Sequence, residues 1–228
     1  MKSFVFGLMS LAFLVAAAPV PDPVRDRIIV ESRAMNPAGV TFDRTTKSVR
    51  TGGGTVTDTV KVERWDGRKW SVLSINGKRP STNQKTETLK ATTSAPVPGY
   101  HRMAVLLSGA TDRGTDAQGR TVLKIPVLPV GSVRTDTGDI SSHLMAEATI
   151  AQRTAPGSGQ PWVERVKVTA REPFRMNMLI KVQNFEQVSE YRLDANGKPR
   201  LVSQTADSSG TMFGFPGGEK TEVTYTYR

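Results

Sequence analysis

The stretch WVERVKVTAR, residues 162–171, decides the fold. Apolar and polar side chains alternate along it: Val166 and Val168 fall on one face, and Arg165 and Lys167 fall on the other. A period of two residues is typical of a strand with one buried and one solvated face. The sequence therefore predicts a strand here, in a sheet that is covered on one side.

The same alternation resumes in FRMNMLIKVQ, residues 174–183, and predicts a second strand. Its apolar face is unusually wide and rich in methionine, an adaptable side chain that suits varied apolar partners. The members of this apolar stripe are Phe174, Met176, Met178, Ile180 and Val182.

More short strands follow toward the C-terminus. Asn196-Gly197 lies between residues 189–194 and 199–205 and supplies the positive φ angles of a tight hairpin turn, and residues 222–228 alternate again. Parallel pairing would need a crossover helix between strands, for which residues 160–228 leave no room. We therefore expect an antiparallel meander. Residues 141–153 fit either a helix or the strand that opens this meander.

A second group of strands precedes it. Residues 40–50 and 55–65 flank a run of three glycines, and Asp66-Gly67 joins the latter strand to residues 69–75. The polar residues 76–97 favour a loop or linker. Residues 121–130 predict an edge strand, because prolines interrupt them and proline cannot donate to a sheet.

Two segments have helical spacing. Asp22 and Pro23 form a typical helix start ahead of residues 24–35, and Pro98 precedes an apolar stripe at i, i+3, i+4 and i+7. This second stripe consists of Tyr100, Met103, Ala104 and Leu107. The expected class is α+β, mainly antiparallel: a curved half-barrel sheet covered by two or three helices.

The N-terminus predicts export. Lys2 precedes an apolar run over residues 4–15, and small residues follow, so we expect a signal peptide over residues 1–17 that is cleaved after Ala17. A transmembrane anchor is the alternative, but the run is too short to span a bilayer core of about 30 Å. The predicted mature chain is a single β-rich domain, residues 18–228, in a bacterial periplasm.

Composition excludes several classes of function. The chain of 228 residues has no cysteine, which rules out disulfides, thiolate zinc sites, iron–sulfur clusters and cysteine nucleophiles. Its net charge is +10, but the basic residues are scattered singly along predicted strands and form no nucleic-acid-binding motif. We expect no nucleic acid as partner. Peripheral contact with an anionic membrane suits the charge better, and plain solubility is the other explanation.

No motif predicts a reaction, a cofactor or a metal. The run from Gly214 to Thr221 resembles a phosphate-binding loop, but Glu219 replaces the required glycine and a strand follows it, which favours a hairpin connection. Asp136, Asp139 and His143 match no ligand spacing. A hydrolase that uses His101 or His143 as its base is the weakest functional alternative.

The apolar stripes suggest a ligand. Helices laid on the sheet would either fill the space between the two layers with side chains or leave a cavity for an apolar molecule. The first outcome describes an envelope structural or interaction module, and the second a non-enzymatic lipid-binding protein. The predicted lining residues are Phe174, Met176, Met178, Ile180, Val182, Tyr100, Met103 and Leu107.

The order of elements resembles a known family. A signal peptide, a helix and paired strands lead to the stretch from Trp70 to Lys78, a helix follows, and the meander closes with Tyr191–Leu201 and Tyr225–Arg228. This order is similar to that of the periplasmic lipoprotein-carrier superfamily (LolA/LolB-like), and to an exported branch of it. The resemblance implies a half-open barrel with helical lids, and binding of a lipid or lipoprotein acyl chain.

Overall fold

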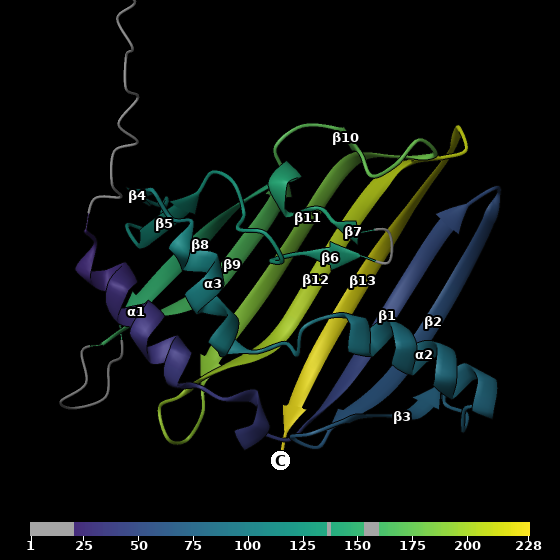
Figure 1. Ribbon diagram of the computed structural model, residues 1–228, viewed down its shortest axis with the longest axis horizontal. Coiled ribbons are helices and arrows are strands. Elements are labelled where there is room, and N and C mark those ends of the chain that lie inside the picture. The colour runs from purple at the N-terminus through teal and green to yellow at the C-terminus, as the bar shows by residue number, and fades with distance from the viewer. Residues whose placement is uncertain (1–20, 136–137, 153–159) are drawn as a thin grey trace, which may run out of the picture.

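The computed structural model describes residues 21–135, 138–152 and 160–228 (Figure 1). Its helices are α1 (Pro23–Ala34), α2 (Thr82–Ser94) and α3 (Met103–Ser108), with 3₁₀ turns η1 (Pro37–Gly39), η2 (Tyr100–Arg102) and η3 (Ser141–His143). Its strands are β1 (Phe42–Gly52), β2 (Thr55–Trp65), β3 (Trp70–Ile75), β4 (Asp112–Thr115), β5 (Thr121–Ile125), β6 (Arg134–Thr135), β7 (Gly138–Asp139), β8 (Leu144–Gln152), β9 (Pro161–Ala170), β10 (Phe174–Arg175), β11 (Ile180–Leu193), β12 (Pro199–Met212) and β13 (Phe215–Tyr227).

One antiparallel sheet dominates the molecule. Its strand order is β3-β2-β1-β13-β12-β11-β9-β8-β5-β4, with β10 paired to β11, and β6 and β7 form a separate small ribbon. The sheet is not closed into a barrel, because β3 and β4 end the order on opposite edges. The predicted class, α+β and mainly antiparallel, is confirmed.

The two groups of strands join through β1 and β13. β1 pairs with β13 over its whole length, from Phe42 opposite Tyr227 to Gly52 opposite Gly217. The strands near the N-terminus and the C-terminal meander therefore belong to one sheet. An aromatic cluster marks the junction, since Phe42 lies 5.6 Å from the rings of both Trp70 and Tyr225.

The helices lie on one face of this sheet (Figure 1). The predicted start of α1 is confirmed, because the Asp22 carboxylate accepts hydrogen bonds from the backbone N–H groups of Val24 and Arg25. Ile28 of α1 and Leu107 of α3 are fully buried in the core against strands that include β8 and β9. The core is thus deepest at the α1 and α3 end of the sheet.

The prediction of a loop over residues 76–97 was wrong, because α2 occupies most of it. Ser81 and Gln84 form a reciprocal capping box: the Ser81 hydroxyl accepts from the Gln84 N–H, and the Gln84 side chain accepts from the Ser81 N–H. Apolar residues are few in α2, so its periodicity is weak, and the capping box is the signal that identifies the helix.

One strand prediction is wrong, and one open alternative is decided. Residues 121–130 do not form an edge strand: β5 ends at Ile125, before the prolines, and pairs with β4 on one side and β8 on the other. The edge strand on this side of the sheet is β4. The ambiguous residues 141–153 are η3 followed by strand β8, except for residue 153, which lies outside the described residues.

The second alternating stretch is a hairpin, not one strand. Residues 174–175 form β10, a turn follows, and β11 begins at Ile180 and returns beside β10, so that Phe174 faces Val182. The turn is closed by the Asn177 carboxamide, which accepts from the N–H groups of Leu179 and Ile180. The turn residues happen to keep apolar and polar side chains in alternation, so the sequence pattern does not show where β10 ends and β11 begins.

The predicted signal peptide and its cleavage after Ala17 lie outside the described residues. Within the residues that the structure describes, none of the helices combines the length and the apolar character needed to cross a membrane.

Candidate ligand site

The predicted lining residues separate into two groups. Tyr100, Met103 and Leu107 of η2 and α3 are buried in the core beneath the helices. Met176, Ile180 and Val182 line a groove at the other end of the sheet, Phe174 is buried, and Met178 is 89% exposed on the hairpin turn. The structure therefore does not bring the eight residues around one space.

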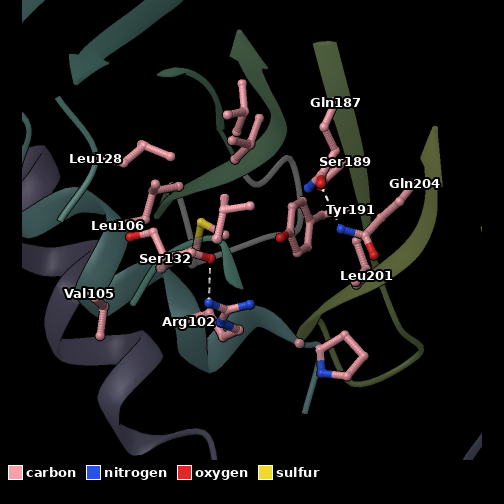
Figure 2. A pocket seen from close by; sticks show the side chains of 16 residues that line it. Arg102, Val105, Leu106, Leu128, Ser132, Gln187, Ser189, Tyr191, Leu201 and Gln204 are labelled. Atoms are coloured by element: carbon pink, nitrogen blue, oxygen red, sulfur yellow. Dashed lines mark hydrogen bonds between the residues drawn. The ribbon is translucent and has the colours of Figure 1, made fainter. Parts of the chain in front are cut away.

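The space beneath α3 is small. A cavity of about 80 Å³ lies between η2–α3 and the sheet, and Met103, Val166 and Leu201 are among its lining residues (Figure 2). It has room for a few water molecules. Ligand pockets usually enclose about 300–1,000 Å³, so this cavity is too small for an acyl chain, and the predicted cavity between sheet and helices is largely filled by side chains.

Polar groups hold this small cavity in shape. The Arg102 guanidinium donates to the backbone carbonyls of Gly131 and Ser132, the latter at 2.7 Å, and so fastens the loop after β5 over the cavity (Figure 2). Gln204 donates to the Ser189 hydroxyl and accepts from Tyr225. Burial lowers the pKa of Arg102, which nevertheless stays a cation at neutral pH. These contacts are those of a packed, hydrogen-bonded layer.

The larger hollow is a groove of about 690 Å³, which we call the distal groove. Residues of the β1–β2, β10–β11 and β12–β13 turns and of the adjoining strand ends line it. Figure 1 shows these turns near one another at one end of the sheet. Arg50 in its wall shares a face of β1 with the buried Phe42, because residues at even offsets along a strand point to the same side of the sheet. The groove therefore continues the helix-bearing face beyond the helices. Its apolar lining residues are Met176, Ile180, Val182, Met212, Phe213, Phe215 and Pro216.

Glycines make the floor of the distal groove. A Cβ atom on Gly218 would lie 2.7 Å from the Ser208 carbonyl oxygen, one on Gly217 would lie 2.8 Å from the Thr51 carbonyl oxygen, and one on Gly210 would overlap the Lys181 carbonyl. These positions admit only glycine, because the neighbouring backbones approach too closely for a side chain. Bare backbone leaves open the volume that side chains would otherwise fill.

Two cations border the groove and differ in their pairing. Arg50 is 3.0 Å from the Glu219 carboxylate, which also accepts from the Ser48 hydroxyl at 2.8 Å. Lys181 forms no ion pair within the described part of the chain. The lining of the groove is thus mostly apolar, with serine and threonine side chains, one compensated cation and one cation that has no ion pair within the described residues.

The two histidines lie in different settings. The His143 ring stacks on Phe174, with the ring centroids 4.4 Å apart. His101 lies on η2, where burial and then the charge of Arg102 lower its pKa. Neither ring hydrogen-bonds to a serine or threonine hydroxyl among residues 21–135, 138–152 and 160–228. The hydrolase hypothesis stays a prediction.

The acidic pair considered as a metal site is only partly described, because Asp136 lies outside the described residues. Asp139 accepts from the Ser141 N–H and hydroxyl and from the Gly131 N–H, bonds that lower its pKa and position the turn before β8. Across the described ranges, no cluster of three or more His, Asp or Glu side chains could hold a metal ion.

Sequence reasoning missed most of the groove. Phe213, Phe215 and the floor glycines Gly217 and Gly218 lie in the stretch TMFGFPGG, residues 211–218, of which only the part from Gly214 onward is interpreted from the sequence, as a hairpin connection. Turns are usually polar, so the phenylalanines in this tight turn are unusual. That irregularity is the sequence feature that could have identified these residues as part of a functional surface.

Comparison with known proteins adds no relative: no family model, curated protein or solved structure matches this chain.

Proposed function

We propose that this protein is a non-enzymatic carrier that binds the acyl chain of a lipid or lipoprotein, or another apolar ligand, in the distal groove. The observation that carries the proposal is the volume of about 690 Å³ together with its apolar walls. That volume lies within the usual range of ligand pockets, whereas the cavity beneath α3 does not.

An acyl chain suits the groove for two reasons. The apolar part of its lining consists of methionine, phenylalanine, proline and branched aliphatic side chains, which adapt to a flexible chain without needing hydrogen-bond partners. Each methylene that leaves water contributes about 0.8 kcal/mol, so a chain of ordinary length is held without any polar contact.

The proposal includes export to the periplasm, which the apolar N-terminal run over residues 4–15 supports. In this interpretation the sheet acts as a curved half-barrel whose lids are α1, α2 and α3, and the uncovered end of its inner face holds the ligand. The proposed resemblance to lipoprotein carriers rests on the same order of elements.

The alternative is an envelope structural or interaction module without a ligand. The well-filled layer beneath α3 favours it, because a carrier that opened between helices and sheet would need more room there. The two functions differ in one observable, the presence of an apolar molecule in the distal groove.

The test combines extraction with a designed variant. Mass spectrometry of organic extracts from the natively purified protein should reveal lipid, and a fluorescent sixteen-carbon fatty acid should bind in buffer without membranes. Ile180→Asp places a carboxylate in the groove wall and should weaken binding of this probe at least about tenfold, because an acyl chain cannot solvate the charge.

The matched control is Val49→Asp. Val49 is not among the residues that line the groove, and it lies next to Arg50 on β1, so the two side chains point to opposite faces of the sheet. It should leave probe binding unchanged. Absence of extracted lipid together with equal probe binding by both variants would refute the carrier and favour the structural module.

A further inference from the structure

Five large apolar side chains are exposed together at the end of the molecule that carries the distal groove. We call them the apolar tip: Met178, Leu179, Met212, Phe213 and Phe215. Met178 is 89% exposed, Phe213 65% and Phe215 67%. Single exposed apolar residues are ordinary, but a contiguous group marks a surface that contacts something apolar.

Two turns that are distant in the sequence form this tip. The N–H of Phe213, in the β12–β13 turn, donates to the Leu179 carbonyl of the β10–β11 turn at 2.9 Å. Met212 pairs with Ile180 in the adjoining strands. The backbone thus locks the two turns side by side, so their apolar side chains act as one surface.

Phe213 has an unfavourable backbone conformation as well as an exposed ring. Its φ is 52°, in the left-handed region that costs an ordinary residue about 1–2 kcal/mol. The turn after β3 has the same shape with a suitable residue: Asn76 has a φ of 50° and precedes Gly77, as Phe213 precedes Gly214. Asparagine at position 213 would therefore adopt this backbone conformation with less strain than phenylalanine does. The turn itself does not explain the phenylalanine, which suggests that its exposed ring serves a function.

The charges beside the tip indicate its partner. Arg175 is exposed, and its guanidinium donates to the Met178 carbonyl. Neither Arg175 nor Lys181 forms an ion pair with any described acidic residue, whereas the nearby Glu219 is neutralised by Arg50. Apolar side chains flanked by uncompensated cations suit the surface of an anionic bilayer, in which the rings enter the interface and the cations meet lipid headgroups.

We propose that the apolar tip docks this protein on anionic membranes, with Phe213 and Met178 inserted in the interface and Arg175 and Lys181 at headgroup level. In this orientation the distal groove opens toward the bilayer, because Phe213 and Phe215 belong to both surfaces. Docking goes beyond the proposed function, since it requires no ligand in the groove.

The test measures co-sedimentation of the full chain with lipid vesicles. One set contains phosphatidylcholine alone, and in the other about a third of the lipid is phosphatidylglycerol. The wild-type protein should bind the anionic set more tightly. Phe213→Asn should weaken that binding about tenfold or more, because one buried aromatic ring is lost. The double change Arg175→Gln and Lys181→Gln should weaken it about fivefold per charge.

Folding controls keep this result interpretable. Phe213→Asn should raise the midpoint of thermal unfolding or leave it unchanged, because asparagine tolerates the left-handed conformation. Val30→Gln removes an apolar side chain that is 67% exposed on α1, distant from the tip, and should bind vesicles as the wild type does (Figure 1).

Three outcomes overturn the proposal: equal binding of the wild type to both vesicle sets, wild-type binding by Phe213→Asn, and loss of binding in Val30→Gln. Self-association that Phe213→Asn abolishes, without vesicle binding, would assign the tip to a second copy of the chain and would also overturn it. Failure here leaves the carrier untouched, because the fatty-acid assay with Ile180→Asp contains no membrane.

Discussion

Glu63 is a charged side chain without any exposed surface, and it connects α2 to the sheet. Its carboxylate lies 2.7 Å from the Arg44 guanidinium and 3.4 Å from the Lys61 ammonium, and it accepts from the Thr92 hydroxyl of α2. Arg44 also lies over the Trp70 ring, at 4.4 Å. A buried carboxylate needs all of these partners, because desolvation of an unpaired charge is costly.

Glu63→Gln should therefore destabilise the protein by about 3 kcal/mol, since it leaves two cations without their shared counterion. Urea unfolding measures this change. The control is Asp207→Asn, which breaks the exposed pair with Lys220 at 3.2 Å and should cost less than about 1 kcal/mol. Equal losses in the two variants would contradict the central role of Glu63.

Helix α2 depends on its first turn more than on its apolar face. The capping box of Ser81 and Gln84 satisfies N–H groups that a helix otherwise leaves unpaired. Ser81→Ala should lower the free energy of unfolding by about 1 kcal/mol in urea titrations. Thr82→Ala, one residue later, removes no capping bond and serves as the control; a loss as large as that of Ser81→Ala would contradict the capping argument.

Local signals explain which elements could be predicted. The β2–β3 and β11–β12 hairpins and α1 were predicted correctly, because turn residues such as Asp66-Gly67 and cap residues such as Asp22 form their hydrogen bonds within a few positions. Strand alternation failed at residues 174–183, because the Asn177 turn interrupts it without changing its polarity pattern. Helix α2 was missed because its apolar periodicity is weak, and only the capping pair of Ser81 and Gln84 indicates that a helix begins there.

The distal groove has no local signal of this kind. It arises where three turns from both ends of the chain meet, and its floor depends on backbone approach between Gly218 and Ser208 and between Gly217 and Thr51. Those distances follow from the pairing of β1 with β13 and of β12 with β13. The alternation in the sequence indicates which residues form apolar stripes. Which of these stripes borders an open groove depends on how the strands pair in the sheet, and the sequence pattern does not give that pairing.

The joined sheet also predicts how the whole molecule responds to acid. Asp43 of β1 accepts from Arg64 of β2 at 2.7 Å and from Arg228 at the end of the chain at 2.6 Å. The hydrogen bond from Arg64, and then that from Arg228, lower the pKa of Asp43 from 3.8 to about 2. This carboxylate thus ties three segments together near the junction between β1 and β13.

A pKa that is lower in the folded state than in the unfolded state stabilises the fold above the unfolded value. The contribution of Asp43 should be present at pH values well above 3.8 and should be lost as the pH falls through about 2. Solvent screens the partly exposed arginines, so we expect about 1 kcal/mol. Urea titrations of the wild type and Asp43→Asn should differ by this amount at neutral pH and converge in acid. An undiminished difference below the folded pKa of about 2 would show that Asp43 acts through packing and not through its charge.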